Sequence, residues 1–481
     1  MRLKPLFASM LLLLALAALW PPVYAQETAS KSIEGIWQGA LSVSGIQLRL
    51  VVKIHKQPGG TLTGTMDSID QGAKDIPIDQ VTFKDNTLRL ELKGIGGVYE
   101  GKLNAAGTEF AGEWQQGGNA LPLTLARTEK AIELRRPQEP QKPYPYDEEE
   151  LTFENKAAGV KLAGTLTRPK TGGPFPAVVL IAGSGPNNRN EDVLGHKVFL
   201  VLADYLTRHG IAVLRYDKRG IGASTGSYLK ATTADFAADA LAAVEYLKGR
   251  KEIAADKIGL IGHSEGGVIA PIVASESKDV AFVVLMAGTG IPGEQILYLQ
   301  GALIAQANGA SPKAIAREKA LQEQIFTVVK QEKDPAVAEK KIEAAEAKTI
   351  AQLSPAEKKD AENQLKQLQA GNKTLLTPWF RYFLTYDPKT ALRKVQCPIL
   401  VLNGSKDLQV PPKENLPAIQ GALQEAGNKD VTIKELTGLN HLFQTCKTGS
   451  PLEYSKIEET MSPVALQTIS DWIQAHTQTG N

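Results

Sequence analysis

Cysteine is scarce in this chain of 481 residues, which holds only Cys397 and Cys446. Cys397 precedes a strand-like run, PILVLN, whereas Cys446 follows a later strand and the loop after it, so we expect the two thiols at opposite ends of one sheet. A strand of six residues spans about 20 Å, well beyond the ~7 Å limit for the Cα atoms of a disulfide. The sequence therefore predicts two free thiols and excludes a scaffold built on disulfides.

The chain also lacks an excess of charge of either sign. Lys and Arg number 54 against 52 for Asp and Glu, and the two signs are mixed along the whole chain. A nucleic-acid-binding protein would need a basic patch, so this class of partner is not expected. Clusters of His, Cys and Asp with the spacing of metal ligands are missing too, and we expect neither a metal nor a cofactor.

The first residues combine two cations, an apolar run and a small-residue site. Arg2 and Lys4 precede the run 11–20, Pro21 and Pro22 follow it, and VYA ends at Ala25. This pattern predicts a signal peptide over residues 1–25 and export to the periplasm or the medium. The run is short for a bilayer span of about 20 residues, so no membrane span is expected in the mature protein. The alternative is a retained membrane anchor.

A length of 481 residues indicates two or more domains. Residues 26–130 contain short β-rich segments separated by Gly, Asn and Asp, which predict a small antiparallel barrel or sandwich. Residues 131–150 are rich in proline and charge and predict an extended linker. We assign no chemistry to the β-rich segment.

The pattern changes after residue 150. In residues 151–291 and 386–481 a hairpin-like segment is followed by apolar runs of strand length that alternate with helical stretches, which is typical of a mostly parallel sheet covered on both faces. Residues 292–385 hold no β-rich run, and the stretches 312–333, 335–353 and 355–371 are helical. This insertion is either a solvated bundle or a lid over the strand ends.

One short stretch, KIGLIGHSEGGVIAPIVAS, places Ser264 between a buried strand and a helix. Gly262 and Gly266 lie two positions to either side, where a sharp turn from strand to helix needs room. Ser264 is then either a reactive nucleophile or part of a tight loop. The choice depends on whether the chain supplies partners for it.

A serine nucleophile needs a histidine to take its proton and a carboxylate to hold that histidine. Asp407 follows the strand-like run PILVLN, and His441 follows the next such run. Both positions are at the carboxyl ends of predicted strands, where open α/β sheets carry their sites. The order Ser264, Asp407, His441 thus predicts a catalytic triad.

The chain resembles the α/β-hydrolase superfamily. The resemblance rests on these three residues in their local contexts, on the loop YDKRGIGASTG (216–226) and on the loop GSGPNNRNED (183–192). The likeness covers about residues 151–476. With the signal peptide and β-rich domain, the chain is similar to exported bacterial serine esterases related to prolyl-oligopeptidase-like and dienelactone-hydrolase-like enzymes. The resemblance implies the α/β-hydrolase fold with a helical cap.

The oxyanion of the tetrahedral intermediate needs two N–H donors. The residue after the nucleophile, Glu265, supplies one from its backbone. The second is expected from the backbone of Ser184, where many relatives carry His-Gly-Gly. The Glu265 carboxylate itself is expected at the surface or behind the site, and His263 is expected to pack or orient.

Other polar loop residues, Asn187, Arg189, Asp217 and Arg219, are expected to stabilise their own loops, with substrate contact as the alternative. The aromatic residues between 379 and 383 are expected to pack in a core or to line an acyl pocket.

The predicted function is hydrolysis of small-molecule carboxylic esters through an acyl-enzyme intermediate. The alternatives are a serine peptidase of the aminopeptidase or prolyl-oligopeptidase type and a non-catalytic binding protein on a hydrolase scaffold. Acyl chain length and oligomeric state stay open.

Overall fold

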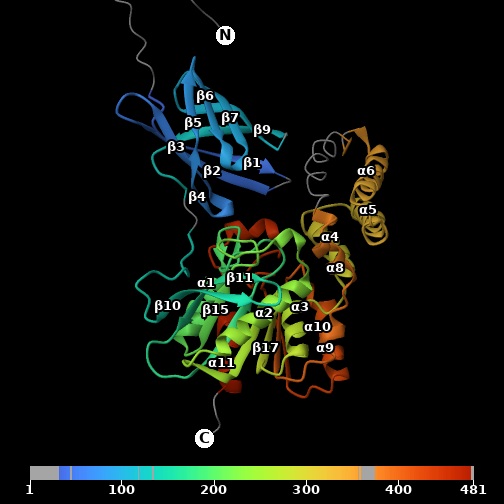
Figure 1. The fold of residues 1–481 in the computed structure, drawn as a ribbon. Coiled ribbons are helices and arrows are strands. Elements are labelled where there is room, and N and C mark those ends of the chain that lie inside the picture. The colour runs from blue at the N-terminus through green and yellow to red at the C-terminus, as the bar shows by residue number, and fades with distance from the viewer. Residues whose placement is uncertain are drawn as a thin grey trace, which may run out of the picture.

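The computed structural model describes residues 32–477 except 44–45, 118, 133–134, 356 and 359–373 (Figure 1). The predicted signal peptide, residues 1–25, lies outside the described residues, as does most of the third predicted helix of the insertion.

The first part of the chain forms one antiparallel sheet of nine strands in the order β4-β3-β2-β1-β9-β8-β7-β6-β5, which curves into a nearly closed barrel (Figure 1). Alternate side chains point inward, and Trp37, Tyr99 and Phe110 are fully buried there. The strands are β1 (Gly35–Val43), β2 (Ile46–Lys56), β3 (Leu62–Ser68), β4 (Ala73–Ile78), β5 (Gln80–Lys84), β6 (Thr87–Leu92), β7 (Gly97–Leu103), β8 (Glu109–Gln116) and β9 (Asn119–Thr128). Of the two predicted architectures, the barrel is confirmed.

A second sheet of eight strands follows, in the order β10-β11-β15-β12-β16-β17-β18-β19. Strands β10 and β11 form an antiparallel hairpin, and from β15 to β19 neighbouring strands are parallel. The strands are β10 (Asp147–Asn155), β11 (Val160–Arg168), β12 (Phe175–Ile181), β15 (Ala212–Tyr216), β16 (Ile253–His263), β17 (Phe282–Met286), β18 (Ile399–Gly404) and β19 (Val431–Leu436). The expected mostly parallel sheet is confirmed.

The hairpin begins earlier than the sequence indicated. Residues 147–150 belong to β10 and pair with the end of β11, although their charges and the prolines before them suggested a linker up to residue 150. Cations beyond the hairpin stabilise this acidic stretch. Arg250 contacts Glu149 at 2.6 Å, and Arg189 contacts Glu150.

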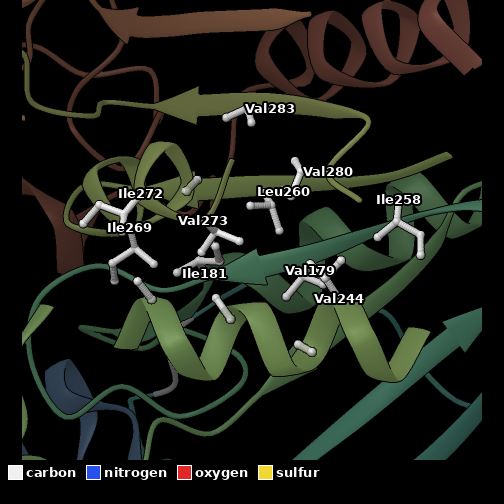
Figure 2. Packing of buried hydrophobic residues seen from close by; sticks show 14 of the residues in the cluster. Val179, Ile181, Val244, Ile258, Leu260, Ile269, Ile272, Val273, Val280 and Val283 are labelled. Atoms are coloured by element: carbon white, nitrogen blue, oxygen red, sulfur yellow. The ribbon is translucent and has the colours of Figure 1, made fainter. Parts of the chain in front are cut away.

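Helices cover both faces of this sheet because its central strands are apolar on both sides. Side chains of α2 and α3 pack on one face, where Figure 2 shows Val244, Ile269 and Val273 gathered against strand residues Val179 and Leu260. Helices α1 and α11 pack on the other face. The covering helices are α1 (Val198–Arg208), α2 (Thr233–Lys248), α3 (Gly266–Glu276), α9 (Lys389–Leu392), α10 (Pro412–Glu425) and α11 (Pro463–Thr477).

Between β17 and α9, the described residues form the helices α4 (Gly293–Ala307), α5 (Pro312–Gln331), α6 (Pro335–Ala351) and α8 (Pro378–Thr385). Ser311 and Asp334 cap α5 and α6 by accepting backbone N–H groups, with Pro at the next position in each case. Phe326, Ile342 and Phe380 help to form a small core shared by these helices. The segment therefore has packing of its own beside the main sheet.

The barrel and the α/β unit are joined by the segment after β9. Arg136 donates to the backbone carbonyls of Gly195, beside the hairpin of β13 (Asp192–Val193) and β14 (His196–Lys197), and of Ser455. Ser455 belongs to the short 3-10 helix η4 (Pro451–Lys456); the others among the described residues are η1 (Ile69–Gln71), η2 (Lys93–Ile95) and η3 (Tyr228–Lys230).

Both cysteines are free, as predicted. Within the described ranges, no helix is long and apolar enough to cross a bilayer, and no three His, Cys, Asp or Glu side chains are grouped to hold a metal ion.

Candidate active site

Ser264 occupies the corner between β16 and α3 with a φ of +53°, in the left-handed region. The two flanking glycines leave room for the turn. A Cβ on Gly262 would lie 2.0 Å from the carbonyl O of Gly266, and a Cβ on Gly266 would lie 2.0 Å from that of Ile181. A non-glycine residue in the left-handed region costs free energy, and such residues gather at functional sites. The backbone therefore holds the Ser264 side chain at the end of the strand.

His441 and Asp407 meet in a buried hydrogen bond. The Nδ1 atom of His441, in the loop after β19, lies 2.8 Å from Oδ2 of Asp407, in the loop after β18. The other carboxylate oxygen, Oδ1, accepts the backbone N–H groups of Gln409 and Val410, each at 2.8 Å. These bonds fix the carboxylate and leave Oδ2 to orient the imidazole.

Ser264 and His441 face one cavity of about 230 Å³. Ser184 lines the same cavity. Asp407 lies behind His441 and is hydrogen-bonded to it, and Glu265 directly follows Ser264 at the start of α3. The structure thus gathers the predicted site residues at the carboxyl ends of β12, β16, β18 and β19. The cavity is lined by Gly183, Ser184, Asn187, Glu191, Val193, Leu194, His263, Ser264, Gln409, His441, Leu442, Pro451 and Tyr454.

The loop after β12 comes close to the serine and is tightly held. A Cβ on Gly183 would lie 3.1 Å from the Cβ of Ser264. The Asn187 side-chain amide donates to the carbonyls of Gly183 (2.8 Å) and Ser184 (3.0 Å). Among the described residues, the backbone N–H groups of Ser184 and Glu265 have no acceptor. Both groups are thus free to donate to an oxyanion.

Two residues that the sequence did not single out as functional lie beneath this loop. Glu191 accepts the N–H of Gly183 at 2.6 Å, and the Nζ of Lys218 donates to the carbonyl of Gly183 at 2.5 Å. Glu191 lies in the loop 183–192 and Lys218 in the loop 216–226. A charged residue in a loop is usually exposed, so the sequence did not indicate that both side chains are buried.

The carboxylate of Glu265 is fully buried, which corrects the part of the expectation that placed it at the surface. It accepts from Thr233 Oγ1 at 2.8 Å and Trp379 Nε1 at 2.6 Å, and its Oε2 lies 3.2 Å from Lys218 Nζ. The Lys218 ammonium also lies 4.6 Å from the ring centroid of Phe236. Burial of this carboxylate is possible because a cation and two donors meet it there.

His263 bridges the loops instead of only filling space. Its Nδ1 lies 2.9 Å from Glu191 Oε1, and its Nε2 lies 3.0 Å from the carbonyl O of His441. Burial lowers the pKa of His263, but the charge of Glu191 and the hydrogen bond to it outweigh burial, and the pKa lies above the ordinary value.

The remaining loop residues stabilise structure by joining different elements, whereas the expectation placed these contacts within their own loops. Arg189 binds Asp217 through its Nη2 at 2.8 Å, and Arg219 binds Asp239 through its Nε at 2.7 Å. The aromatic residues of α8 pack mainly within the helical segment, and none of them lines the cavity beside Ser264.

The chain matches the X-Pro dipeptidyl-peptidase (S15) family over residues 158–434. It is 28% identical over 307 residues to Esterase EstD of Thermotoga maritima, a match that spans 63% of this chain and 64% of that protein's length, less than two thirds.

Solved structures with a similar arrangement include an esterase of Pyrococcus furiosus (TM-score 0.41, 17% identity, 69% of this chain and 90% of that chain). Another is the α/β hydrolase GrgF of Penicillium sp. sh18 (TM-score 0.41, 18% identity, 69% of this chain and 99% of that chain).

The sheet order, the Ser264 turn and the family match over more than half of the chain agree with one another. The chain has the α/β-hydrolase fold and belongs to the X-Pro dipeptidyl-peptidase (S15) family.

Proposed function

We propose that this protein hydrolyses carboxylic esters through an acyl-enzyme intermediate on Ser264. His441 takes the hydroxyl proton as Ser264 Oγ attacks the ester carbonyl, and Asp407 stabilises the imidazolium that forms. The N–H groups of Glu265 and Ser184 hold the oxyanion. His441 then protonates the departing alcohol. Water, deprotonated by His441, attacks the acyl-enzyme and releases the carboxylic acid and free Ser264.

The observation that carries this proposal is the meeting of Ser264 and His441 at one cavity, with Asp407 bonded to the far side of the imidazole at 2.8 Å. A histidine held in this way presents its Nε2 away from the carboxylate, as a general base requires. The left-handed backbone of Ser264 adds a second, independent sign of a nucleophile.

The size and lining of the cavity favour small, uncharged acyl groups. A volume of about 230 Å³ is below the ~300–1,000 Å³ typical of sites for larger ligands. Its apolar lining comes from Val193, Leu194, Leu442 and Pro451. The likeness to an esterase of Thermotoga maritima supports an ester as the substrate.

The second candidate is cleavage of a dipeptide from a peptide that carries proline, which the family match favours. Such a substrate brings an ammonium group, which needs an anionic partner. Glu191 is the one acidic side chain among the residues that line the cavity. Its Oε1 already accepts the N–H of Gly183 and contacts Nδ1 of His263. Its other oxygen, Oε2, has no hydrogen-bond partner among the described residues, but the side chain is 1% exposed and its charge already faces His263. An ammonium would have to reach this buried carboxylate, so we rank the ester first.

The two candidates differ in the leaving group that the purified protein accepts. We expect turnover of p-nitrophenyl acetate and butyrate, a sharp decline for the octanoate ester, and little release of p-nitroaniline from Ala-Pro-p-nitroanilide. Ser264→Ala is the control and should be inactive on all of them. Turnover confined to the anilide would replace the esterase by the peptidase, and turnover by neither would leave a binding protein.

Export is a separate proposal, based on the residues up to Ala25. Expression of the full chain in a Gram-negative host followed by fractionation should give a periplasmic or secreted protein whose first residue is Gln26. A cytoplasmic protein that keeps its first residues, or one retained in the membrane, would contradict it.

A further inference from the structure

A buried carboxylate and a buried imidazole lie directly beneath the loops of the proposed site. Glu191, in the loop after β12, is 1% exposed, and His263, at the end of β16, is 3% exposed. Glu191 Oε1 accepts from the backbone of Gly183, and the two His263 nitrogens reach Glu191 and the carbonyl of His441. One short chain of bonds thus joins the loop of Ser184, the strand before Ser264 and the loop of His441.

The partners of the His263 ring determine its protons. The Nε2 atom faces a backbone carbonyl, which can only accept, so this nitrogen carries hydrogen. The Nδ1 atom faces Glu191 Oε1, an oxygen that already accepts the N–H of Gly183 at 2.6 Å. When Glu191 is ionised, this oxygen is an acceptor too, and Nδ1 then carries hydrogen as well. A ring with hydrogen on both nitrogens is a cation, and Glu191 would then be its counter-charge.

We propose that Glu191 and His263 form a buried ion pair, with His263 as an imidazolium, that positions the oxyanion loop and His441 relative to Ser264. The positioning role rests on the proposed function, whereas the charge state of the pair does not. Neither residue touches the reacting atoms, so both are positioning residues.

The surroundings of His263 favour the cation. The titratable groups that face it are Glu191 from the loop after β12, Asp407 from the loop after β18 and the His441 ring from the loop after β19, at 4.9 Å between ring centroids. Two of these groups are carboxyls. Glu191 also has a φ of +48°, a conformation that costs a non-glycine residue free energy and is kept where contacts hold it.

A second buried histidine provides an internal comparison. His196 is fully buried. Its Nδ1 meets the hydroxyl of Thr460, its Nε2 meets the carbonyl of Tyr454 and the side-chain amide of Gln444, and no carboxylate of the described residues contacts it. The hydroxyl can donate to one nitrogen, so a neutral ring satisfies both bonds. The two buried histidines should therefore differ by one proton in the same protein.

Nitrogen NMR of the full-length protein, labelled with ¹⁵N in the histidine rings, tests the charge state. At about pH 7.5, one unit above the ordinary imidazole pKa of about 6.5, His263 should show two protonated nitrogens and His196 only one. Loss of a signal in His263→Gln and in His196→Gln assigns each ring. A His263 ring with one unprotonated nitrogen, which a shared proton or a protonated Glu191 would give, overturns the proposal. Turnover is not needed, so a failed esterase assay leaves this result intact.

The positioning role is tested by the pH profile of Glu191→Gln, which keeps the side-chain shape and removes the counter-charge. Its kcat for p-nitrophenyl acetate should fall by about tenfold or more with little change in KM. The loss should deepen as pH rises, because His263 then gives up its proton at a lower pH than in the unmodified protein. Glu252→Gln, outside the site beside Arg250, is the control. An equal fall in kcat at every pH would reduce Glu191 to a structural role and overturn the proposal.

Discussion

Trp379 donates its indole N–H to Glu265 across 2.6 Å, which ties helix α8 of the inserted segment to the residue that follows Ser264. The two residues are 114 positions apart in the chain. The bond connects the helical segment directly to Glu265 at the start of α3, whose backbone N–H is the proposed oxyanion donor. A movement of α8 would therefore shift Glu265, the residue next to Ser264.

Trp379→Phe removes this donor and keeps an aromatic ring in its place. The Glu265 carboxylate then loses one of its three partners while it stays buried, so we expect the free energy of unfolding to fall by about 1–3 kcal/mol. Urea denaturation measures this loss. Tyr382→Phe, on the same helix, is the control. If both variants lose the same stability, the indole bond contributes nothing.

Lys218→Met leaves the Glu265 carboxylate without its cation. Both side chains are at most 5% exposed, and removal of one partner from a buried ion pair costs about 3–5 kcal/mol. Lys248→Met breaks the exposed pair with Asp279 and should cost less than about 1 kcal/mol.

The double variant Lys218→Met with Glu265→Gln removes both charges at once. It should recover much of the stability that Lys218→Met loses, as urea denaturation of the three proteins would show. Equal stability of Lys218→Met and Lys248→Met would argue against a buried ion pair.

The stability of the protein should fall at mildly acidic pH through His196. Burial lowers the pKa of His196 from its ordinary 6.5 to about 4. In the unfolded chain His196 binds a proton below about pH 6.5, whereas in the folded protein it binds one only below about pH 4. The free energy of unfolding therefore declines as the pH falls from about 6.5 to about 4, by about 3 kcal/mol in all. Above this range the group has no effect.

His196→Gln removes this dependence. Urea denaturation at about pH 7 and about pH 4.5 should show a smaller decline for the variant than for the unmodified protein. His209→Gln, at an exposed position, is the control and should behave as the unmodified protein does. The same decline in all three proteins would show that His196 is not the group responsible.

Asp407→Asn tests the orienting carboxylate. The amide keeps the size of the side chain but does not stabilise the imidazolium, so kcat should fall by about 10³–10⁴. Asp430→Asn is a matched control, because Asp430 contacts His476 at 3.3 Å in an exposed pair, and it should leave kcat unchanged. A fall of less than about tenfold in Asp407→Asn would remove Asp407 from the triad.

Much of the α/β fold could be predicted because its strands are continuous apolar runs. Runs such as Phe175–Ile181 and Phe282–Met286 carry this signal in their own residues. The turn at Ser264 could be predicted for a similar reason, since the flanking glycines are local. The start of β10 was missed because its acidic residues carry no apolar pattern of their own, and both the β11 residues that pair with them and the cations that contact them lie elsewhere in the chain.

The buried charges around the site could not be predicted from local sequence. Glu191 and His263 are 72 positions apart, and Lys218 and Glu265 are 47 apart. A charged residue in a loop is exposed by default, and only a partner brought close by the fold makes its burial tolerable. For the same reason Glu265 was expected at the surface or behind the site, although a cation and two donors enclose its carboxylate.

The most direct test of a nucleophile at Ser264 is covalent labelling with a p-nitrophenyl alkylphosphonate, followed by peptide mass spectrometry. A single phosphonyl group should appear on the peptide that carries Ser264, with ester hydrolysis lost in proportion. Ser264→Ala should take up no label and hydrolyse no p-nitrophenyl acetate above the rate of buffer. Label on another residue, or normal ester hydrolysis by Ser264→Ala, would contradict a nucleophile at this position.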